Sequence, residues 1–173
     1  MGELHGWTTC PRCTGPLEGS ADALVCPHCG SHYYANSAPT ASALIEDEEG
    51  RLLLGRRALE PYLGFWDTIG GFLHEGESPE DGLRREVMEE TGLEIELGPF
   101  LGVWMDRYGH ADDAVRTLNL FWVVRAVGGE LAPADDVAEL AWFDRDELPS
   151  ADELAFDAIE HVLAAWRAYR DTE

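Results

Sequence analysis

The sequence predicts an α+β domain preceded by a small module with too few apolar residues to fold around a core of its own. Three observations support this class. Four cysteines are confined to residues 10–29, short apolar-rich runs follow from about residue 39, and residues 78–92 carry the end signals of a helix. The chain has 173 residues, 45% of them hydrophobic, which is enough for an independent core. We therefore assign residues 1–38 to the module and residues 39–173 to the larger domain.

The cysteines of the module form two Cys-x-x-Cys pairs, Cys10 with Cys13 and Cys26 with Cys29. Each pair can occupy a tight turn that directs two thiolates at one point, and two such turns complete the tetrahedral shell of a structural zinc site. Two disulfides and free thiols are the alternatives, and a reducing compartment disfavours the first of them. The spacing predicts a zinc ribbon with no open coordination position.

The runs that follow predict short strands, and residues 35–40 ahead of them have the composition of a linker. The third of these strands is expected to end before Gly70 and Gly71. Apolar residues from Leu154 to Trp166 recur at near-helical spacing and predict a final helix that packs on the core. The strands are expected, in chain order, at Ser42–Glu46, Arg51–Arg56, Phe65–Ile69, Thr117–Val127 and Glu139–Phe143.

One further helix has both of its ends marked in the sequence. Ser78 is a favourable N-cap, Pro79 suits the first helical position, and Gly92 suits the position just after the last turn. Leu83 and Val87, four residues apart, lie on one face and predict its buried stripe.

Three glutamates lie close together on another face of this helix: Glu86, Glu89 and Glu90. Like charges at this spacing destabilise a helix by roughly 0.2–0.5 kcal/mol per pair. A solvated acidic face is one explanation. A divalent cation is the other, because Mg²⁺ prefers oxygen ligands such as carboxylates. Gly70 and Gly71, which precede the helix, lack side chains and would let a backbone carbonyl and a phosphate approach closely.

Net charge limits the partners of the protein. The chain has 34 acidic and 12 basic residues, which gives a net charge of −22. This balance opposes contact with the phosphates of DNA or RNA and with an anionic membrane. The sequence has no apolar run of membrane-spanning length and no basic-then-apolar N-terminus, so the expected location is the cytoplasm.

Residues 71–93 match every defining position of the Nudix box, and by this motif the chain resembles the Nudix hydrolase family over roughly residues 39–170. Many members have Pro-Gly-Gly at the start of the box, where this chain has Ile69 before its two glycines. The resemblance implies an α/β/α sandwich around a mixed sheet. It also implies Mg²⁺- or Mn²⁺-dependent hydrolysis of a phosphoanhydride bond in a nucleoside diphosphate linked to another group. The matching string is Gly71-x5-Glu77-x7-Arg85-Glu86-Val87-Met88-Glu89-Glu90-Thr91-Gly92-Leu93.

The resemblance also implies a set of metal ligands. Glu89 and Glu90 are expected to be the main ligands, and Glu86 is expected to be a further ligand or the base that activates water. Gly70 would offer its backbone carbonyl to the metal. Glu77 would contact the metal through water.

The resemblance also implies a role for Arg85 and several candidates for the general base. Arg85 would orient a carboxylate of the box rather than touch the substrate. The general base is either Glu86 or, as in some members of the family, an acid on a later loop. The candidates on that loop are Asp135, Asp136 and Glu139.

The substrate is not fixed by these motifs. A zinc ribbon ahead of a Nudix domain is similar to the NADH pyrophosphatase branch, but the specificity string of that branch has no match at residues 101–110. NADH, ADP-ribose and dinucleoside polyphosphates are therefore the candidate small-molecule substrates. Arg56 and Arg57 are candidate phosphate contacts, and Trp66 and Tyr108 are candidate stacking surfaces.

A non-catalytic nucleotide sensor or adaptor is the alternative function, with the zinc ribbon bound to a protein or RNA partner. The intact set of carboxylates favours the enzyme, because a pure binder could lose these mutually repelling charges. The ribbon carries a single Arg, Arg12, which disfavours nucleic-acid binding, and neither DNA nor a membrane is an expected partner. Members of the family are often dimers, so a homodimer is an expected assembly.

Overall fold

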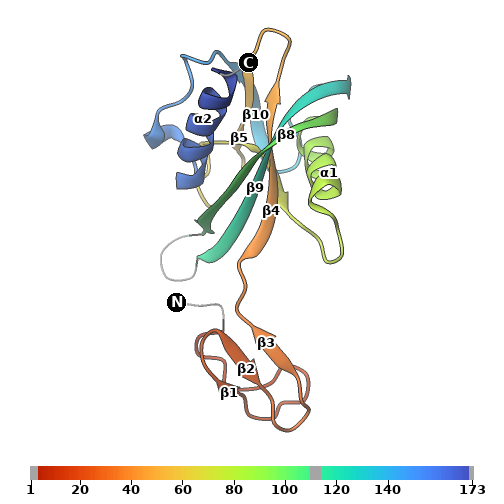
Figure 1. Cartoon of the computed structure of the whole chain (residues 1–173), viewed down its shortest axis with the longest axis vertical. Helices are drawn as coiled ribbons and strands as arrows, with labels where there is room; N and C mark the ends of the chain where they lie inside the picture. Colours follow the sequence, from red (N-terminus) through yellow and green to blue (C-terminus); the bar gives the residue numbers. More distant parts are fainter. Residues whose placement is uncertain (1–3, 110–113, 172–173) are drawn as a thin grey trace.

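The computed structural model describes residues 4–109 and 114–171, which form a small sheet and a large sheet flanked by helices (Figure 1). The small sheet has the order β1-β2-β3, with β1 at Glu18–Gly19, β2 at Ala23–Val25 and β3 at His32–Tyr34. The other elements are β4 (Ala38–Glu46), β5 (Leu52–Arg57), β6 (Trp66–Asp67), β7 (Ile69–Phe72), α1 (Pro79–Thr91), β8 (Leu93–Tyr108), β9 (Val115–Gly129), β10 (Val137–Phe143), the 3₁₀ helix η2 (Ala151–Glu153) and α2 (Asp157–Arg170).

The large sheet is mixed. Its main order is β10-β5-β4-β9-β8, while β6 pairs with β5 and β7 pairs with β4. The two long central strands, β4 and β9, run parallel, and the other pairings are antiparallel. The helices α1 and α2 lie on opposite faces of this sheet (Figure 1). The predicted α+β class and the implied α/β/α sandwich are therefore confirmed.

Each face of the large sheet packs on its own apolar core. On the α1 face, Leu83 and Val87 of the helix are fully buried against alternate residues of the central strands such as Ile45. On the α2 face, Ile159 and Trp166 pack against the intervening residues of the same strands. Because both faces are covered, the central strands contain nearly continuous apolar runs.

Two predicted boundaries shift in the structure. The first strand begins at Ala38, inside the segment predicted as a linker, because parallel pairing with β9 starts there. Gly70 and Gly71 lie within β7 rather than after a strand, paired with Ser42 and Ala41. Gly70 has a φ of 147°, and a Cβ atom on it would lie 2.2 Å from the Ala41 carbonyl oxygen. Only glycine allows this close pairing.

The helix ends agree with the sequence. The Ser78 hydroxyl accepts a hydrogen bond from the Asp81 amide at 3.1 Å, and Gly92 adopts a left-handed φ of 71° at the C-terminus of α1. In the C-terminal segment, Leu154 lies before α2 instead of within it, although its side chain is buried in the same core as Trp166.

The long strand β8 was absent from the sequence-based prediction. It pairs with β9 over almost its whole length, with register shifts around Gly98, Pro99 and Gly102. These three residues interrupt the apolar alternation that would otherwise indicate a strand.

No helix in the described part of the chain is long and apolar enough to cross a membrane.

Candidate active site and cysteine cluster

The candidate site begins where the α2 face of the sheet changes from apolar to polar. Leu44 of β4 is buried beneath α2, whereas Thr40 and Ser42, on the same face, lie beyond the start of the helix. On the neighbouring strand, Thr117 and Asn119 take the same position. Asn119 accepts a hydrogen bond from the Thr40 hydroxyl at 2.7 Å and donates to the Thr117 hydroxyl at 3.1 Å. These residues form the polar floor of a pocket.

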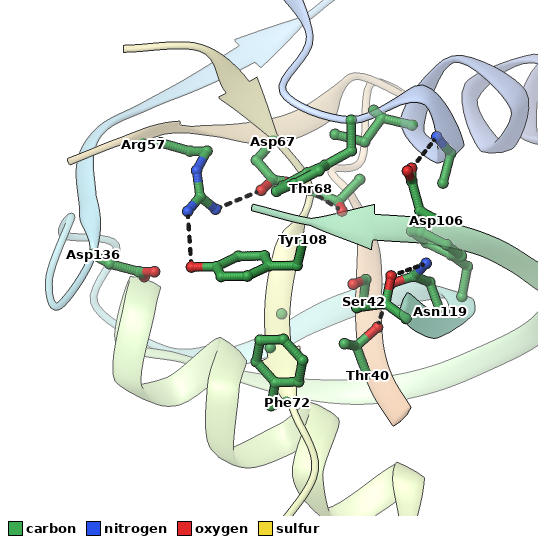
Figure 2. A pocket seen from close by; sticks show the side chains of 17 residues that line it. Thr40, Ser42, Arg57, Asp67, Thr68, Phe72, Asp106, Tyr108, Asn119 and Asp136 are labelled. Carbon is green, nitrogen blue, oxygen red and sulfur yellow. Dashed lines mark hydrogen bonds and ion pairs between the residues drawn. The ribbon is translucent and has the colours of Figure 1, made fainter. Parts of the chain in front are cut away.

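Figure 2 shows the side chains that line this pocket. Its volume is about 100 Å³. Four aromatic residues line it: Phe72 of β7, Tyr108 of β8, Phe121 of β9 and Phe156, which directly precedes α2. The Phe72 and Tyr108 rings meet edge to face with centroids 5.2 Å apart. Gly70, Gly71 and Asp136 also line the pocket, so it opens directly beside the box.

Arg57 is the central cation of the pocket wall. Its side chain is buried and forms a 2.9 Å ion pair with Asp67, while its Nε donates to the Pro61 carbonyl at 2.7 Å. Its third nitrogen lies 3.4 Å from the Tyr108 hydroxyl. Figure 2 shows the side chains of Arg57 and Tyr108 pointing toward each other. Burial raises the pKa of Asp67 to about 6 even though Arg57 opposes this shift.

Glu90 is the most deeply buried carboxylate of the box, with 6% of the residue exposed. It reaches from α1 to the sheet, where it accepts a 2.9 Å hydrogen bond from the backbone N–H of Gly70. Burial raises its pKa well above the ordinary value, and the adjacent Asp136 raises it further. A carboxylate held in this way favours either a proton or a metal cation.

Glu86 lies one helical turn earlier, directly over Gly71. A Cβ atom on Gly71 would come within 2.6 Å of the Glu86 carboxylate, so the glycine makes this approach sterically feasible. Burial also raises the pKa of Glu86, while the ion pair with Arg85 lowers it.

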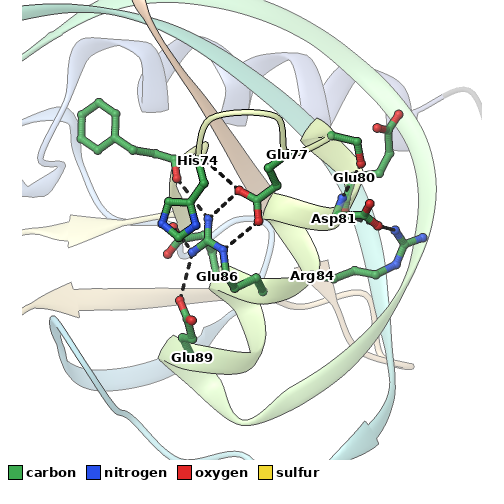
Figure 3. Close-up of polar contacts among 10 residues, drawn as sticks. His74, Glu77, Glu80, Asp81, Arg84, Glu86 and Glu89 are labelled. Atoms are coloured by element: carbon green, nitrogen blue, oxygen red, sulfur yellow. Dashed lines mark hydrogen bonds and ion pairs between the residues drawn. The ribbon is translucent and has the colours of Figure 1, made fainter.

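Three other carboxylates of the box, those of Glu77, Glu86 and Glu89, lie close together (Figure 3), and Arg85 forms ion pairs with all three. It donates two hydrogen bonds of 2.9 Å to Glu77, one of 2.7 Å to Glu86 and one of 3.0 Å to Glu89. A fifth bond reaches the Phe72 carbonyl. The guanidinium lowers the pKa of Glu77 to about 2. In this arrangement Arg85 holds box carboxylates in place.

The donor chemistry of this region fits a hard divalent cation. Glu90, Asp136 and Asp67 form a group of acids, and the pKa of Glu90 is raised first by its burial and then by the neighbouring Asp136 and Asp67. Oxygen atoms are the ligands that Mg²⁺ takes, and a cation would relieve the repulsion among these acids. Of the glutamates that Arg85 binds, Glu86 lies next to this region, over Gly71.

The structure separates the substrate contacts expected from the sequence into two groups. Arg57 and Tyr108 line the pocket. Trp66 is only 6% exposed and belongs to the apolar core between α2 and the sheet. The guanidinium of Arg56 packs over the Trp66 ring. Arg56 also forms a 2.8 Å ion pair with Glu139. Neither Arg56 nor Trp66 is among the residues that line the pocket.

Of the three candidate general bases on the later loop, one lines the pocket and two do not. Asp136 lines the pocket and adjoins Glu90. Asp135 is exposed, and Glu139 is held by Arg56 outside the pocket.

Several pocket residues were missed at the level of sequence: Asp67, Phe72, Asp106, Asn119 and Phe156. The polar floor of the pocket could have been predicted from the sequence, because polar residues precede apolar ones at alternate positions of the strands β4 and β9. No comparable signal exists for Phe156, because it reaches the pocket through the packing of α2 on the sheet.

The four cysteines come together as the spacing predicts. Their sulfur atoms all lie within 4.8 Å of one another, with Cys10 and Cys29 at 3.7 Å and Cys13 and Cys26 at 3.5 Å. These separations exclude disulfide bonds, whose sulfur atoms lie about 2.05 Å apart. Zinc–sulfur bonds of about 2.3 Å in a tetrahedron place the sulfur atoms about 3.8 Å apart.

Two similar backbone turns support the cluster. The amide of Cys10 donates to the Gly15 carbonyl and the amide of Cys26 to the Ser31 carbonyl, both at 2.8 Å. The Tyr33 hydroxyl lies 3.1 Å from the sulfur of Cys10. The cluster is therefore preorganised for a tetrahedral metal ion.

Comparison with known proteins identifies relatives. An NAD-capped RNA hydrolase NudC from Chromobacterium violaceum is 30% identical over 149 residues, which cover 84% of this chain and 53% of that protein. An ADP-ribose pyrophosphatase from Methanocaldococcus jannaschii is 34% identical over 128 residues, 72% of this chain and 70% of that protein. The chain thus spans about half the length of the NudC relative.

The fold has similar solved structures. The crystal structure of a NUDIX hydrolase from Nitrosomonas europaea matches with a TM-score of 0.72 and 22% identity, over 88% of this chain and 85% of that chain. The family model described as the NUDIX domain matches residues 36–165. With the box, the sandwich and this match in agreement, the chain belongs to the Nudix hydrolase family.

Proposed function

We propose that the protein hydrolyses a phosphoanhydride bond in a nucleoside diphosphate linked to another group, with Mg²⁺ or Mn²⁺ as its cofactor. The observation that carries this proposal is the buried carboxylate of Glu90, which accepts a hydrogen bond from Gly70 and adjoins Asp136, and these two residues line the ring-lined pocket. The relatives named for ADP-ribose and for NAD-capped RNA support substrates built on a nucleoside diphosphate. NADH, ADP-ribose and dinucleoside polyphosphates remain the candidates.

In this proposal Glu86, Glu89 and Glu90 hold the metal together with the Gly70 carbonyl, and Glu77 contacts it through water. A bound divalent cation would neutralise charge on the diphosphate and lower the pKa of coordinated water.

The residues of the chain supply the remaining requirements. Arg85 fixes the carboxylates of the box, which limits the reorganisation needed when the substrate binds. Asp136 is the strongest candidate among the loop acids for the general base, because it lies within the pocket. Glu86 is the alternative base inside the box, and its raised pKa brings it closer to neutral pH.

A substrate panel with product identification tests the reaction. Purified protein is incubated with ADP-ribose, NADH, NAD⁺ and a diadenosine polyphosphate, with and without Mg²⁺ or Mn²⁺. We expect turnover only with metal, and a loss of at least about 100-fold in kcat for Glu90→Gln. Glu80→Gln removes an exposed acid from the first turn of the same helix and serves as the control.

The sensor hypothesis makes the opposite forecast. If no compound of the panel is hydrolysed, and if Glu89→Gln and Glu90→Gln leave metal and nucleotide binding unchanged, the enzymatic proposal is wrong. Salt-sensitive RNA binding by the full chain, lost in a cysteine variant, would then favour an adaptor.

A further inference from the structure

Each of the three guanidinium nitrogens of Arg57 already has a partner within the protein. The side chain is buried, and its nitrogens contact the Asp67 carboxylate, the Pro61 carbonyl and the Tyr108 hydroxyl. A bidentate phosphate contact uses two N–H groups of a guanidinium, so a phosphate would have to compete with these partners. The contacts of Arg57 therefore indicate a role in holding protein groups in place.

The backbone beside Arg57 is joined to the loop that carries Asp136. The Ala58 amide donates a 2.7 Å hydrogen bond to the Asp136 carbonyl. Val137, the first residue of β10, is the register partner of Arg57 at the end of β5. Figure 2 shows the Asp136 carboxylate directed toward the Tyr108 hydroxyl, which is also a contact of Arg57. The position of Asp136 therefore depends on where the end of β5 lies.

The loop that carries Asp136 is fastened on its other side to α1. The Ala134 amide donates a 3.0 Å hydrogen bond to the backbone carbonyl of Glu90. Between the two anchors, Asp135 has a φ of 53°, a left-handed conformation that is uncommon for residues other than glycine. Such a conformation persists only where the surrounding structure holds it in place. The loop is thus fixed between a proposed metal ligand, Glu90, and the end of β5.

Arg57 also balances negative charge next to Asp136. Asp67, Glu90 and Asp136 line one small cavity of about 20 Å³, and Arg57 is the cation among the described residues that line it. The 2.9 Å ion pair with Asp67 offsets one of these three negative charges. Without the guanidinium, a buried and ionised Asp67 would repel Asp136 and displace its carboxylate. Arg57 thus favours a fixed position for Asp136 by charge as well as by backbone contact.

We propose that Arg57 is a positioning residue, which holds the loop acid Asp136 beside Glu90 rather than binding the phosphates of the substrate. The inference rests on the proposed function, in which Asp136 is the loop candidate for the general base. A general base has to lie within hydrogen-bonding distance of the water that it activates, so a small displacement of Asp136 lowers kcat. Substrate affinity is unaffected, because Arg57 does not contact the substrate.

The test measures kcat and KM for Arg57→Gln, Asp136→Asn and the double variant, with the panel compound that turns over fastest. We expect Asp136→Asn to lower kcat by at least about 100-fold, as removal of a general base does. Arg57→Gln should lower kcat by about 10–100-fold, the usual loss for a residue that orients a reacting group, and leave KM unchanged. In the Asp136→Asn background, Arg57→Gln should cause no further loss, because its effect passes through Asp136.

Two further variants complete the design. The control is Arg51→Gln, which removes an ion pair with Asp47 just before β5 and should leave kcat and KM unchanged. Arg57→Gln leaves the buried Asp67 without its cation, so Arg57→Gln/Asp67→Asn, which removes both charges, serves as a second test in case the single variant does not fold. Its kcat should also fall by at least about tenfold, because the bonds to Pro61 and Tyr108 remain lost.

Hydrogen exchange provides a measurement that does not depend on activity. The Ala58 amide, which donates to Asp136, is followed by NMR in the full chain. Its exchange should be at least about tenfold faster in Arg57→Gln than in Arg51→Gln, because the loop opens locally when its anchor is weakened.

The possible failures can be told apart. A raised KM with unchanged kcat in Arg57→Gln, or an equal loss of kcat with and without Asp136, overturns the inference and leaves the proposed function intact. Full activity of Asp136→Asn does the same and assigns the base to Glu86. If the wild-type protein hydrolyses no compound, the proposed function fails, and the exchange of the Ala58 amide decides the inference. Faster exchange in Arg57→Gln supports it, and unchanged exchange overturns it.

Discussion

The cysteine-containing segment and the Nudix sandwich are held together by different means. The sandwich has two apolar cores, one on each face of a long mixed sheet. In residues 4–34, the buried apolar side chains besides the cysteines are Leu4 and Leu24, and the cysteine sulfurs converge at the centre. We therefore expect the small segment to depend on a bound metal ion for its stability, whereas the large one depends on burial. Two predictions test this contrast and two more concern polar groups within the sandwich; they are given from the largest expected effect to the smallest.

Loss of one cysteine should unfold the small segment entirely. Cys26→Ser removes a buried thiolate from the cluster, and structural zinc sites supply about 10–16 kcal/mol in small modules. We expect zinc content to fall from one ion per chain to none, with new proteolytic cleavage in residues 4–34 and little change in the Tm of the sandwich. His28→Asn, which alters an exposed side chain beside the cluster, should retain the metal. Protection of this segment after metal removal would contradict the prediction.

A cavity in the core of the sandwich should lower the stability of the sandwich and leave the cysteine cluster intact. Trp166 is fully buried and donates a hydrogen bond to the buried Glu46, so Trp166→Ala should destabilise the protein by about 3–5 kcal/mol. Trp7→Ala, at a side chain that is 44% exposed, should change stability by less than about 0.5 kcal/mol. Urea denaturation followed by circular dichroism measures both. Zinc content should stay unchanged in Trp166→Ala, and its loss would show that the two parts are not independent.

The next prediction concerns the organisation of the box. Arg85→Lys keeps the charge but cannot reproduce the bonds that the guanidinium makes to three glutamates and a carbonyl. We expect a 10–100-fold loss of kcat, as is typical when a residue that orients metal ligands is replaced. Arg84→Lys changes the exposed neighbour and should have no such effect. Higher metal concentration should partly rescue Arg85→Lys, which a purely structural defect would not allow.

The smallest effect is a pH dependence. The pKa of Asp67 is raised to about 6 from an ordinary value of 3.8, mainly by burial. A raised carboxylate pKa favours folding below the ordinary value, and this contribution is lost as pH rises through about 6. Carboxyl NMR should therefore show Asp67 titrating near pH 6, while Glu77, with a pKa of about 2, stays ionised down to far lower pH. An Asp67 midpoint near 4 would contradict the burial argument.

The features that the sequence predicted are those encoded locally. The N-cap at Ser78, the C-terminal Gly92 and the cysteine turns depend on residues a few positions apart, and the structure confirms each. The placement of the glutamates on α1 follows from helical periodicity in the same way.

The features that were missed depend on contacts between distant residues. β8 is a strand because β9 pairs with it, despite Gly98, Pro99 and Gly102. Asp67 and Phe156 are pocket residues because separate elements converge on the same face of the sheet. Trp66 illustrates the reverse case, since an aromatic residue near the box is buried in the core instead of lining the pocket.

The irregular shape of β8 has a consequence for the behaviour of the protein in concentrated solution. This strand lies at one end of the sheet order and exposes Phe100, Val103 and Met105 along its length. A long, flat and apolar edge would act as a template for intermolecular strand addition and hence for aggregation. The bulges around Gly98 and Gly102 bend the edge out of the regular hydrogen-bonding register. The same irregularity that hid this strand from prediction thus makes the edge a poorer template for strand addition than a regular strand of the same length would be.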